Sequence, residues 1–443
     1  MSSLQEKITA AILTQIRSRR SSSSSREQAS SQPSNAAAPA KLREARFSDF
    51  YAVAELKNRW GLAADSIENW ERLWRRNPAI EQNGVQPPIG WVLEANGAIV
   101  GYLGNIPLHC HYGNNTLTAV AAHGFVVDAP YRAVGLSLAS AFFRQKGVDL
   151  YLSTSAIEAV GKIAVAFKSA PVPQADYDTV LFWVLQPYPF ARALMKKLNL
   201  GPTLSRVGSI IASVAIGIDR ILRRRWPKPA PSLYTISEIA PNDIEDNFQT
   251  IWDKKLKEGP RLFGDRSPVA LRWHFDIPGD RGCARVICCR KNEELVGYAV
   301  VRSDTDPKNG LQKSVIADLI ARQDDPAIVR ALLAAAHGHA KQSGSHVLEM
   351  QGFPADIRRV CAEGNPYQRK YPACPYYYKA ADPVLHKALS DGAAWYACPY
   401  DGDATLIRPS YSGVSQKMQN SALESGRDSI LADVPQSVGT EVC

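Results

Sequence analysis

The clearest hydrophobic pattern in the chain is a strand that ends in a turn and restarts as a helix, over residues 119–146. Apolar and β-branched residues run up to Val127, and Asp128-Ala129-Pro130 then interrupts the strand. Arg132-x-x-Gly135-x-Ser137 follows and leads into the amphipathic run LASAFFRQK. The pattern therefore predicts a buried strand, a tight turn of small residues and a helix in direct succession.

The segments that flank this turn predict the rest of an α+β unit. Residues 90–108 are typical of a β-hairpin around Asn96-Gly97, a dipeptide that favours a tight two-residue turn. Beyond the motif helix, periodicity predicts a strand, a helix and a closing strand, over residues 148–155, 159–170 and 178–185.

The second half of the chain repeats this pattern. Val-Gly-Tyr at 100–102 recurs at 296–298, and Pro78 recurs as Pro278. In both halves a tryptophan-bearing helix end precedes a hairpin with a polar turn. The second block then predicts a strand, a helix, a strand, a helix and two strands, at 313–321, 325–344, 345–353, 355–364, 376–380 and 394–400. The repetition indicates an internal duplication of one unit.

Composition divides the chain into five parts. Residues 1–40 and 411–443 are polar and of low complexity, which predicts disorder. Between them we expect a first domain over 41–187, a basic helical linker over 188–232 and a second domain over 233–410.

Charge and cysteine usage narrow the class of protein. Of the net charge of +9, most comes from the segment between Arg192 and Lys228, where nine basic residues face one acid, Asp219. The charge is therefore local, and no nucleic-acid partner is expected. The eight cysteines are scattered without a C-x-x-C pair, which predicts reduced thiols and no metal site. With no apolar run of about 18 residues and no signal-peptide core, we expect a cytoplasmic protein.

The turn before the motif helix has the chemistry of an anion-binding site. Small residues at a helix N-terminus leave backbone amides exposed, with the positive end of the helix dipole behind them. Arg132, Gly135 and Ser137 resemble the acyl-CoA-binding motif of the GNAT superfamily of N-acyltransferases, with Ser137 in place of glycine or alanine. The resemblance implies an α+β fold of two GNAT-like domains, each with a mixed, mostly antiparallel sheet flanked by helices. It also implies acetyl-CoA or another acyl-CoA as co-substrate, without a metal, bound by Phe125, Val126, Val127, Arg132, Ala133, Val134, Gly135, Leu136 and Ser137.

The same resemblance suggests catalytic residues. His123 lies on the motif strand, where some family members carry a histidine as general base, and imidazole titrates near neutral pH. The structural alternative is a core histidine held by a hydrogen bond. The family's tyrosine acid is replaced here by Phe167, so Tyr177 is our candidate for protonating the leaving thiolate.

The second block differs at the turn. Arg322-Gln323-Asp324-Asp325-Pro326 has two carboxylates, which would repel a pyrophosphate, and no glycine. Asp324 or Asp325 is expected to cap the next helix, with Pro326 in its first turn. We therefore expect a degenerate second domain that keeps the fold and lacks a CoA site.

The linker helix has two interpretations. Residues 204–225 are apolar along one broad face and end in a cationic cluster. Such a helix can lie on an anionic membrane surface, or it can bridge the two domains with its arginines in water.

These patterns favour an acyl-CoA-dependent N- or O-acyltransferase, most simply an acetyltransferase. Its acceptor would be a small molecule or a glycan, such as a cell-envelope sugar precursor. One alternative is a Fem-type aminoacyl or peptidyl transferase, and another is a non-catalytic, membrane-associated binding module with a vestigial GNAT fold. The sequence leaves the acceptor and the oligomeric state open, and it places the protein in the cytoplasm, either free or peripheral on the membrane.

Overall fold

The computed structural model describes residues 38–407, except for 63, 82–86, 155, 157, 199–200, 230–231, 279–281 and 371–375. The two segments for which the sequence predicts disorder, 1–40 and 411–443, lie outside the described residues apart from 38–40.

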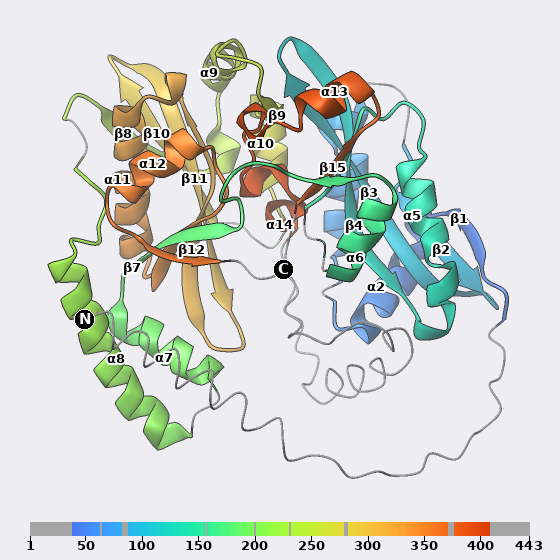
Figure 1. Cartoon of the computed structure of the whole chain (residues 1–443), viewed down its shortest axis with the longest axis horizontal. Helices are drawn as coiled ribbons and strands as arrows, with labels where there is room; N and C mark the ends of the chain where they lie inside the picture. The colour runs from blue at the N-terminus through green and yellow to red at the C-terminus, as the bar shows by residue number, and fades with distance from the viewer. Residues whose placement is uncertain are drawn as a thin grey trace. The chain divides into compact units, whose positions relative to one another are not determined.

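The described strands form two mixed sheets (Figure 1). In the first sheet the strands follow in the order β1 (Lys41–Glu44), β2 (Gly90–Ala95), β3 (Ala98–Tyr112), β4 (Asn115–Val127), β5 (Leu150–Ser153), β15 (Tyr377–Ala380) and β6 (Ala170–Pro171). A further short strand, β9 (Leu262–Gly264), pairs with β3. In the second sheet the order is β14 (Tyr367–Lys370), β7 (Thr179–Val184), β13 (Val347–Met350), β12 (Leu311–Ala321), β11 (Glu294–Asp306), β10 (Ala284–Lys291) and β8 (Thr235–Ile239). In each sheet one parallel pair, β4 with β5 and β12 with β13, lies among antiparallel neighbours, so the predicted α+β class is confirmed.

Helices flank both sheets. Those of the N-terminal half are α2 (Phe50–Arg59), α3 (Ile67–Trp70), α4 (Pro78–Glu81), α5 (Leu136–Phe143) and α6 (Glu158–Ala166). The connection holds α7 (Pro187–Lys197) and α8 (Pro202–Leu222), and the C-terminal half holds α9 (Asn247–Leu256), α10 (Pro268–Phe275), α11 (Pro326–Gln342), α12 (Ala355–Ala362), α13 (Pro383–Ala388) and α14 (Asp403–Leu406). In the described part of the chain, no helix has the length and apolar character that a membrane crossing requires.

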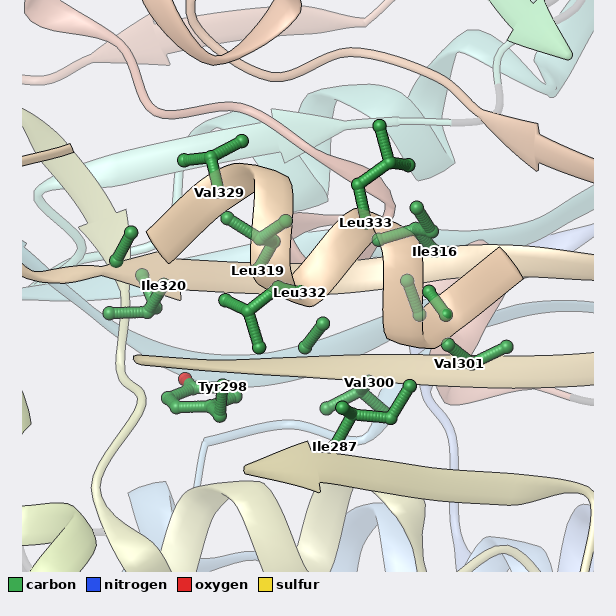
Figure 2. Packing of buried hydrophobic residues seen from close by; sticks show 14 of the residues in the cluster. Ile287, Tyr298, Val300, Val301, Ile316, Leu319, Ile320, Val329, Leu332 and Leu333 are labelled. Carbon is green, nitrogen blue, oxygen red and sulfur yellow. The ribbon is translucent and has the colours of Figure 1, made fainter. Parts of the chain in front are cut away.

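Local sequence explains the main elements. The hairpin between β2 and β3 turns at Asn96 and Gly97, with φ of 50° and 76°, as the dipeptide predicts. The α11 helix starts at Pro326, and the Asp325 side chain accepts a hydrogen bond from the Ala327 amide, which confirms the predicted cap. Figure 2 shows how α11 packs: Val329, Leu332 and Leu333 lie among buried residues of β10, β11 and β12, including Ile287, Val300, Ile316 and Leu319.

Each sheet contains strands from the other half of the chain, which corrects two predictions; the short β9 of the C-terminal half also pairs with β3 in the first sheet. Residues 178–185 were expected to close the first unit, but β7 pairs with β13 and β14 in the second sheet. Conversely β15, expected in the second unit, pairs with β5 and β6 in the first. Trp183 of β7 is fully buried in the core of the second sheet, and Tyr378 of β15 in that of the first. Both strands are short, so their local patterns do not assign them to one sheet.

The C-terminal end of the described chain also differs from prediction. Residues 394–400 were expected to form a strand, but they run as buried irregular chain with an isolated bridge between Trp395 and Leu262. The short helix α14 follows and begins at Asp403. This segment packs against both halves, so tertiary contacts outweigh its local preference for a strand.

Candidate functional site

The parallel strands β4 and β5 diverge in the first sheet. Their last paired residues are Ala121 and Leu152, although β4 continues to Val127. The predicted acyl-group residues, Phe125, Val126 and Val127, lie on the end of β4 that is unpaired on its β5 side, although Val126 and Val127 still pair with β3 on the other side. Beyond Ala121, this edge of β4 therefore no longer pairs with β5.

A β-bulge lies beside the same opening. Tyr102 of β3 faces Val126, and Gly104 faces His123, so β4 has one extra residue here. Gly124 has a φ of 64°, and a Cβ at this position would lie 2.7 Å from the Cε atom of Lys57. Glycine suits both the positive φ and the close approach of the Lys57 side chain. Bulges are common beside active sites, because the extra residue leaves the ladder locally unpaired.

The predicted anion-binding turn follows at the end of β4. Residues 129–134 form a 3₁₀ turn, and α5 starts at Leu136, with no side chain capping its first turn. Ala133, Val134 and Leu136 are exposed, whereas Gly135 is buried. A Cβ on Gly135 would lie 3.1 Å from the Arg132 carbonyl oxygen and 3.2 Å from a methyl group of Val127, so the turn has little room for a larger residue.

Arg132 and Ser137 border this turn. The Arg132 guanidinium lies 5.0 Å from the centre of the Trp60 ring, and the Ser137 hydroxyl donates to the Val134 carbonyl. The structure thus brings the nine predicted CoA-binding residues together along one continuous stretch, from the unpaired end of β4 to the first turn of α5.

His123 lies in a buried cluster of charged side chains. Its Nε2 atom is 2.9 Å from Lys57 Nζ and 3.1 Å from Asp65 Oδ2, and Lys57 and Asp65 are 2.8 Å apart. Its Nδ1 atom faces Asp403 at 3.8 Å, longer than a hydrogen bond. The histidine is 8% exposed. A role as general base therefore requires an acceptor, or a water, to reach the Nδ1 side.

The two carboxylates control the protonation of His123. Burial and the Lys57 charge oppose a positive imidazolium, but Asp65 and Asp403 outweigh them and raise the pKa of His123. Burial alone would raise the pKa of Asp65, but the positive charges of Lys57 and His123 hold it well below its usual value.

Asp403 connects this cluster to the end of β5. Its Oδ1 atom accepts from the Thr154 hydroxyl at 2.7 Å, and its amide donates to the same hydroxyl at 2.9 Å. Asp403 comes from the C-terminal end of the described chain, and Thr154 follows β5 directly. The carboxylate therefore lies where β4 and β5 separate.

The structure gives the surroundings of Phe167 and of Tyr177, the candidate acid. Phe167 stacks on Phe143 at 5.2 Å between ring centres and has no proton to give. Tyr177 packs edge-on against Tyr376, and burial, with the nearby charges of Cys398, Asp401 and Asp403, raises its pKa. The phenol therefore keeps its proton at neutral pH, which leaves it a hydrogen-bond donor but makes it a weak acid.

The corresponding opening in the second sheet is filled by the chain itself. The last paired residues of β12 and β13 are Val315 and Glu349. Beyond them, the Tyr396 hydroxyl donates to the Leu319 carbonyl at 2.5 Å, and the Phe353 amide donates to the Ala397 carbonyl at 2.7 Å. Tyr396, Ala397 and Cys398 are at most 1% exposed. No room for a ligand remains between these two strands at that point.

The turn that follows β12 is filled as well. Asp324 accepts from Lys255 Nζ and from Arg261 Nη1, both at 2.6 Å. A carboxylate of the protein thus neutralises the cations at this turn. An incoming pyrophosphate would have to displace it.

A second buried charged cluster occupies the place equivalent to that of His123. Asp318 of β12 lies 3.1 Å from Arg266, which also contacts Asp401 at 3.0 Å. Arg266 is 0% exposed, and the charges of Asp318 and Asp401 raise its pKa although burial alone would lower it. Asp401 and Asp403, two residues apart, thus contact the clusters of the second and the first half.

Removing the cation of the second cluster is expected to destabilise the fold strongly. Arg266→Leu would leave two buried carboxylates without their partner, and breaking a buried ion pair typically costs about 3–5 kcal/mol. Urea unfolding should therefore show a lower free energy of unfolding by about that amount. As a control, Arg359→Leu removes an exposed pair with Asp356 and should change it by less than about 1 kcal/mol. Equal effects of the two substitutions would contradict the assigned role of Arg266.

Three residues of the His123 cluster were missed in the sequence. Lys57 occupies a buried position on the apolar face of α2, beside Val53 and Leu56, and a lysine at such a position is a usable signal. Lys255 occupies the same kind of position in α9. Asp65 and Asp403 carry no comparable signal, because both lie outside regular apolar patterns.

Other side-chain groups do not extend the site. A cavity of about 40 Å³ lies between residues of both halves, among them His109, Asp265 and Tyr396, and is too small for a nucleotide. Among the described residues, no group of three or more His, Cys, Asp or Glu side chains is placed to hold a metal ion.

Comparison of the amino-acid sequence with known families and curated proteins found no match. No protein-family model matches the chain, and no curated protein is significantly similar to it.

Comparison of structures gave neighbours of low identity. A protein of unknown function from Enterococcus faecalis, described as a probable N-acyltransferase, has a TM-score of 0.50 at 9% identity, over 77% of this chain and 73% of its own. GCN5-related N-acetyltransferases from Kribbella flavida and Anabaena variabilis have TM-scores of 0.48 at 13% and 8% identity, each over 78% of this chain and over 71% and 73% of their own.

The Enterococcus structure matches most of both chains, although the identity is too low to carry over a substrate. The order of elements, the diverging parallel strands and the turn before α5 agree with the resemblance found in the sequence. The chain therefore has the fold of this probable N-acyltransferase.

Proposed function

We propose that the protein is an acyl-CoA-dependent acyltransferase, with its CoA site in the N-terminal half only. One observation carries the proposal: the strands β4 and β5 diverge and lead to an uncapped turn of small residues, whereas the equivalent opening in the second sheet is filled by residues 396–398. The pyrophosphate of CoA would bind at residues 132–137, and the acyl group would lie along residues 125–127.

The chemistry is transfer of an acyl group from sulfur to nitrogen or oxygen. The acceptor attacks the thioester carbon, its proton passes to a base, and the C–S bond breaks to release the CoA thiolate. His123 is our candidate base, since Nδ1 faces the point where the strands separate, and Asp403 stabilises the imidazolium that forms. Tyr177 or water would supply the proton to the thiolate.

Two other functions remain alternatives. A Fem-type aminoacyl or peptidyl transferase is also built from paired GNAT folds, but it has no use for a pyrophosphate-binding turn. A non-catalytic binding module is favoured by Phe167 and by the full set of partners around His123. The acceptor, a small molecule or a glycan precursor, is open in all three cases.

Acetyl-CoA turnover tests the proposal. The full chain is incubated with acetyl-CoA and a panel of acceptors that carry amines or hydroxyls, including amino acids, amino sugars and sugar nucleotides, and the free thiol of released CoA is measured. We expect thiol release that depends on one class of acceptor. Binding of CoA without release for any acceptor would favour the binding module. Modification of an acceptor by an aminoacyl ester donor, with no thiol released from acetyl-CoA, would favour the Fem-type enzyme.

A further inference from the structure

The helix α8 has its apolar side turned to solvent. Its large apolar residues are between 53% and 71% exposed, and they recur every three or four positions: Leu204, Val207, Ile210, Ile211, Val214, Ile218, Ile221 and Leu222. The opposite side of the helix is mostly small or polar apart from the half-buried Ile216, with Ser209 at 0% exposure and Arg220 bonded to the Leu185 carbonyl. α8 lies beside α7, which also exposes Leu194 and Leu198 (Figure 1). We refer to the eight exposed residues of α8 as the apolar stripe.

A helix normally buries its large apolar residues against the protein and exposes the polar ones. In α8 most of the large apolar residues face solvent instead, along a helix of about six turns. Exposed apolar patches of this size on a soluble domain mark an interaction surface.

Positive charge lies at both ends of the stripe. Arg223 and Arg224 follow its last residue and are exposed, and Lys196 and Arg206 are exposed near its beginning. Asp219 pairs with Arg223 and Arg225, so the acid of this segment is already neutralised. Trp226, 43% exposed, adds an aromatic ring of the kind enriched at membrane interfaces.

The basic residues at the two ends of the apolar stripe also argue against a second copy of the chain as the partner that covers the stripe. The spacing of the stripe would suit a helix pair, but a parallel pair would bring Arg223 and Arg224 of both copies together. An antiparallel pair would place them against Arg206 and Lys196 of the other copy. Both arrangements bring like charges together, whereas an anionic lipid surface attracts every one of them.

We propose that α8 is a membrane-docking helix, which lies in the headgroup region of an anionic lipid surface. The apolar stripe enters the boundary of the acyl chains, and the exposed basic residues contact lipid phosphates. This goes beyond the acyltransferase proposal, because it assigns the surface on which the protein works. Arg225 takes no part: it is 14% exposed, pairs with Asp219 and lies 4.1 Å from the ring centre of Tyr367, so it belongs to the fold.

Vesicle sedimentation of the full chain tests the proposal. We expect the protein to sediment with vesicles of equal parts phosphatidylglycerol and phosphatidylcholine at low salt, and to stay in solution with pure phosphatidylcholine. Arg223→Gln with Arg224→Gln should weaken binding by about 30-fold, and raised salt should do the same. Ile211→Ser with Ile218→Ser changes two side chains that are exposed to solvent. This double substitution should weaken vesicle binding by about tenfold or more.

Matched changes elsewhere serve as controls. Lys254→Gln with Arg359→Gln removes the same charge from exposed pairs of the C-terminal half, and Val384→Ser replaces a valine that is 75% exposed. Neither should change vesicle binding by more than about twofold. No binding of the wild-type chain to anionic vesicles would overturn the proposal. So would a dimer in analytical ultracentrifugation that Ile211→Ser with Ile218→Ser converts to monomer, since the stripe would then be covered by a second copy.

Discussion

Replacing His123 with glutamine is expected to lower acyl-transfer turnover by about 10²–10⁴-fold, the usual effect of losing a general base. Glutamine keeps a hydrogen-bonding side chain in the cluster but cannot accept the proton. The affinity for CoA should change little, because His123 lies against Lys57, Asp65 and Asp403 and not on the turn at residues 132–137. Steady-state kinetics, with CoA affinity measured separately, checks both statements.

The pH dependence distinguishes a base from a structural histidine. The pKa of His123 is raised in the folded protein, and the base is its neutral form. The wild-type kcat/KM should therefore rise with pH through an apparent pKa above 6.5. The same shift means that charged His123 stabilises the fold below pH 6.5, and that this stabilisation is lost as pH rises through the folded-state pKa.

The control is His339→Gln, which changes a histidine paired with Glu238 on α11. It should leave both the rate and its pH dependence unchanged. If His123→Gln keeps the wild-type pH profile, then His123 acts only through the stability of its cluster.

An acidic side chain in the turn before α5 is expected to abolish CoA binding. Ser137→Glu places a carboxylate in the first turn of the helix without adding a Cβ. Like charges about 4 Å apart near a protein surface repel by roughly 4 kcal/mol, so the affinity should fall by about 100-fold or more. Gly135→Glu should act in the same direction, with an added clash against the Arg132 carbonyl.

Gly338→Glu is the matched control for these two variants. An added Cβ at Gly338 meets no atom within 4 Å, and the residue lies in α11 of the other half. It should bind CoA as the wild type does. Thermal unfolding of all three variants separates a lost site from a lost fold.

Much of the fold follows from local patterns. The hairpin at Asn96-Gly97, the sequence of strand, turn and helix around Gly135, and the Asp325 cap are each encoded within about ten residues, and the structure confirms them. The exchange of β7 and β15 is different. Each strand is short and carries no local signal for one sheet over the other, whereas Trp183 and Tyr378 pack in the cores of the two different sheets.

The site divides in the same way. The turn residues could be found because their chemistry depends on neighbours in sequence. The partners of His123 could not, since Lys57, Asp65 and Asp403 come from three distant segments. The loss of a CoA site in the second half was predicted from the carboxylates of its turn, but the insertion of residues 396–398 between its strands has no local signal.

Titration of the full-length chain with acetyl-CoA tests the central claim most directly. Isothermal calorimetry should give one site per chain, and Ser137→Glu should lose it while Gly338→Glu keeps it. Two sites per chain, or one site that survives Ser137→Glu, would contradict a CoA site confined to the divergence of β4 and β5.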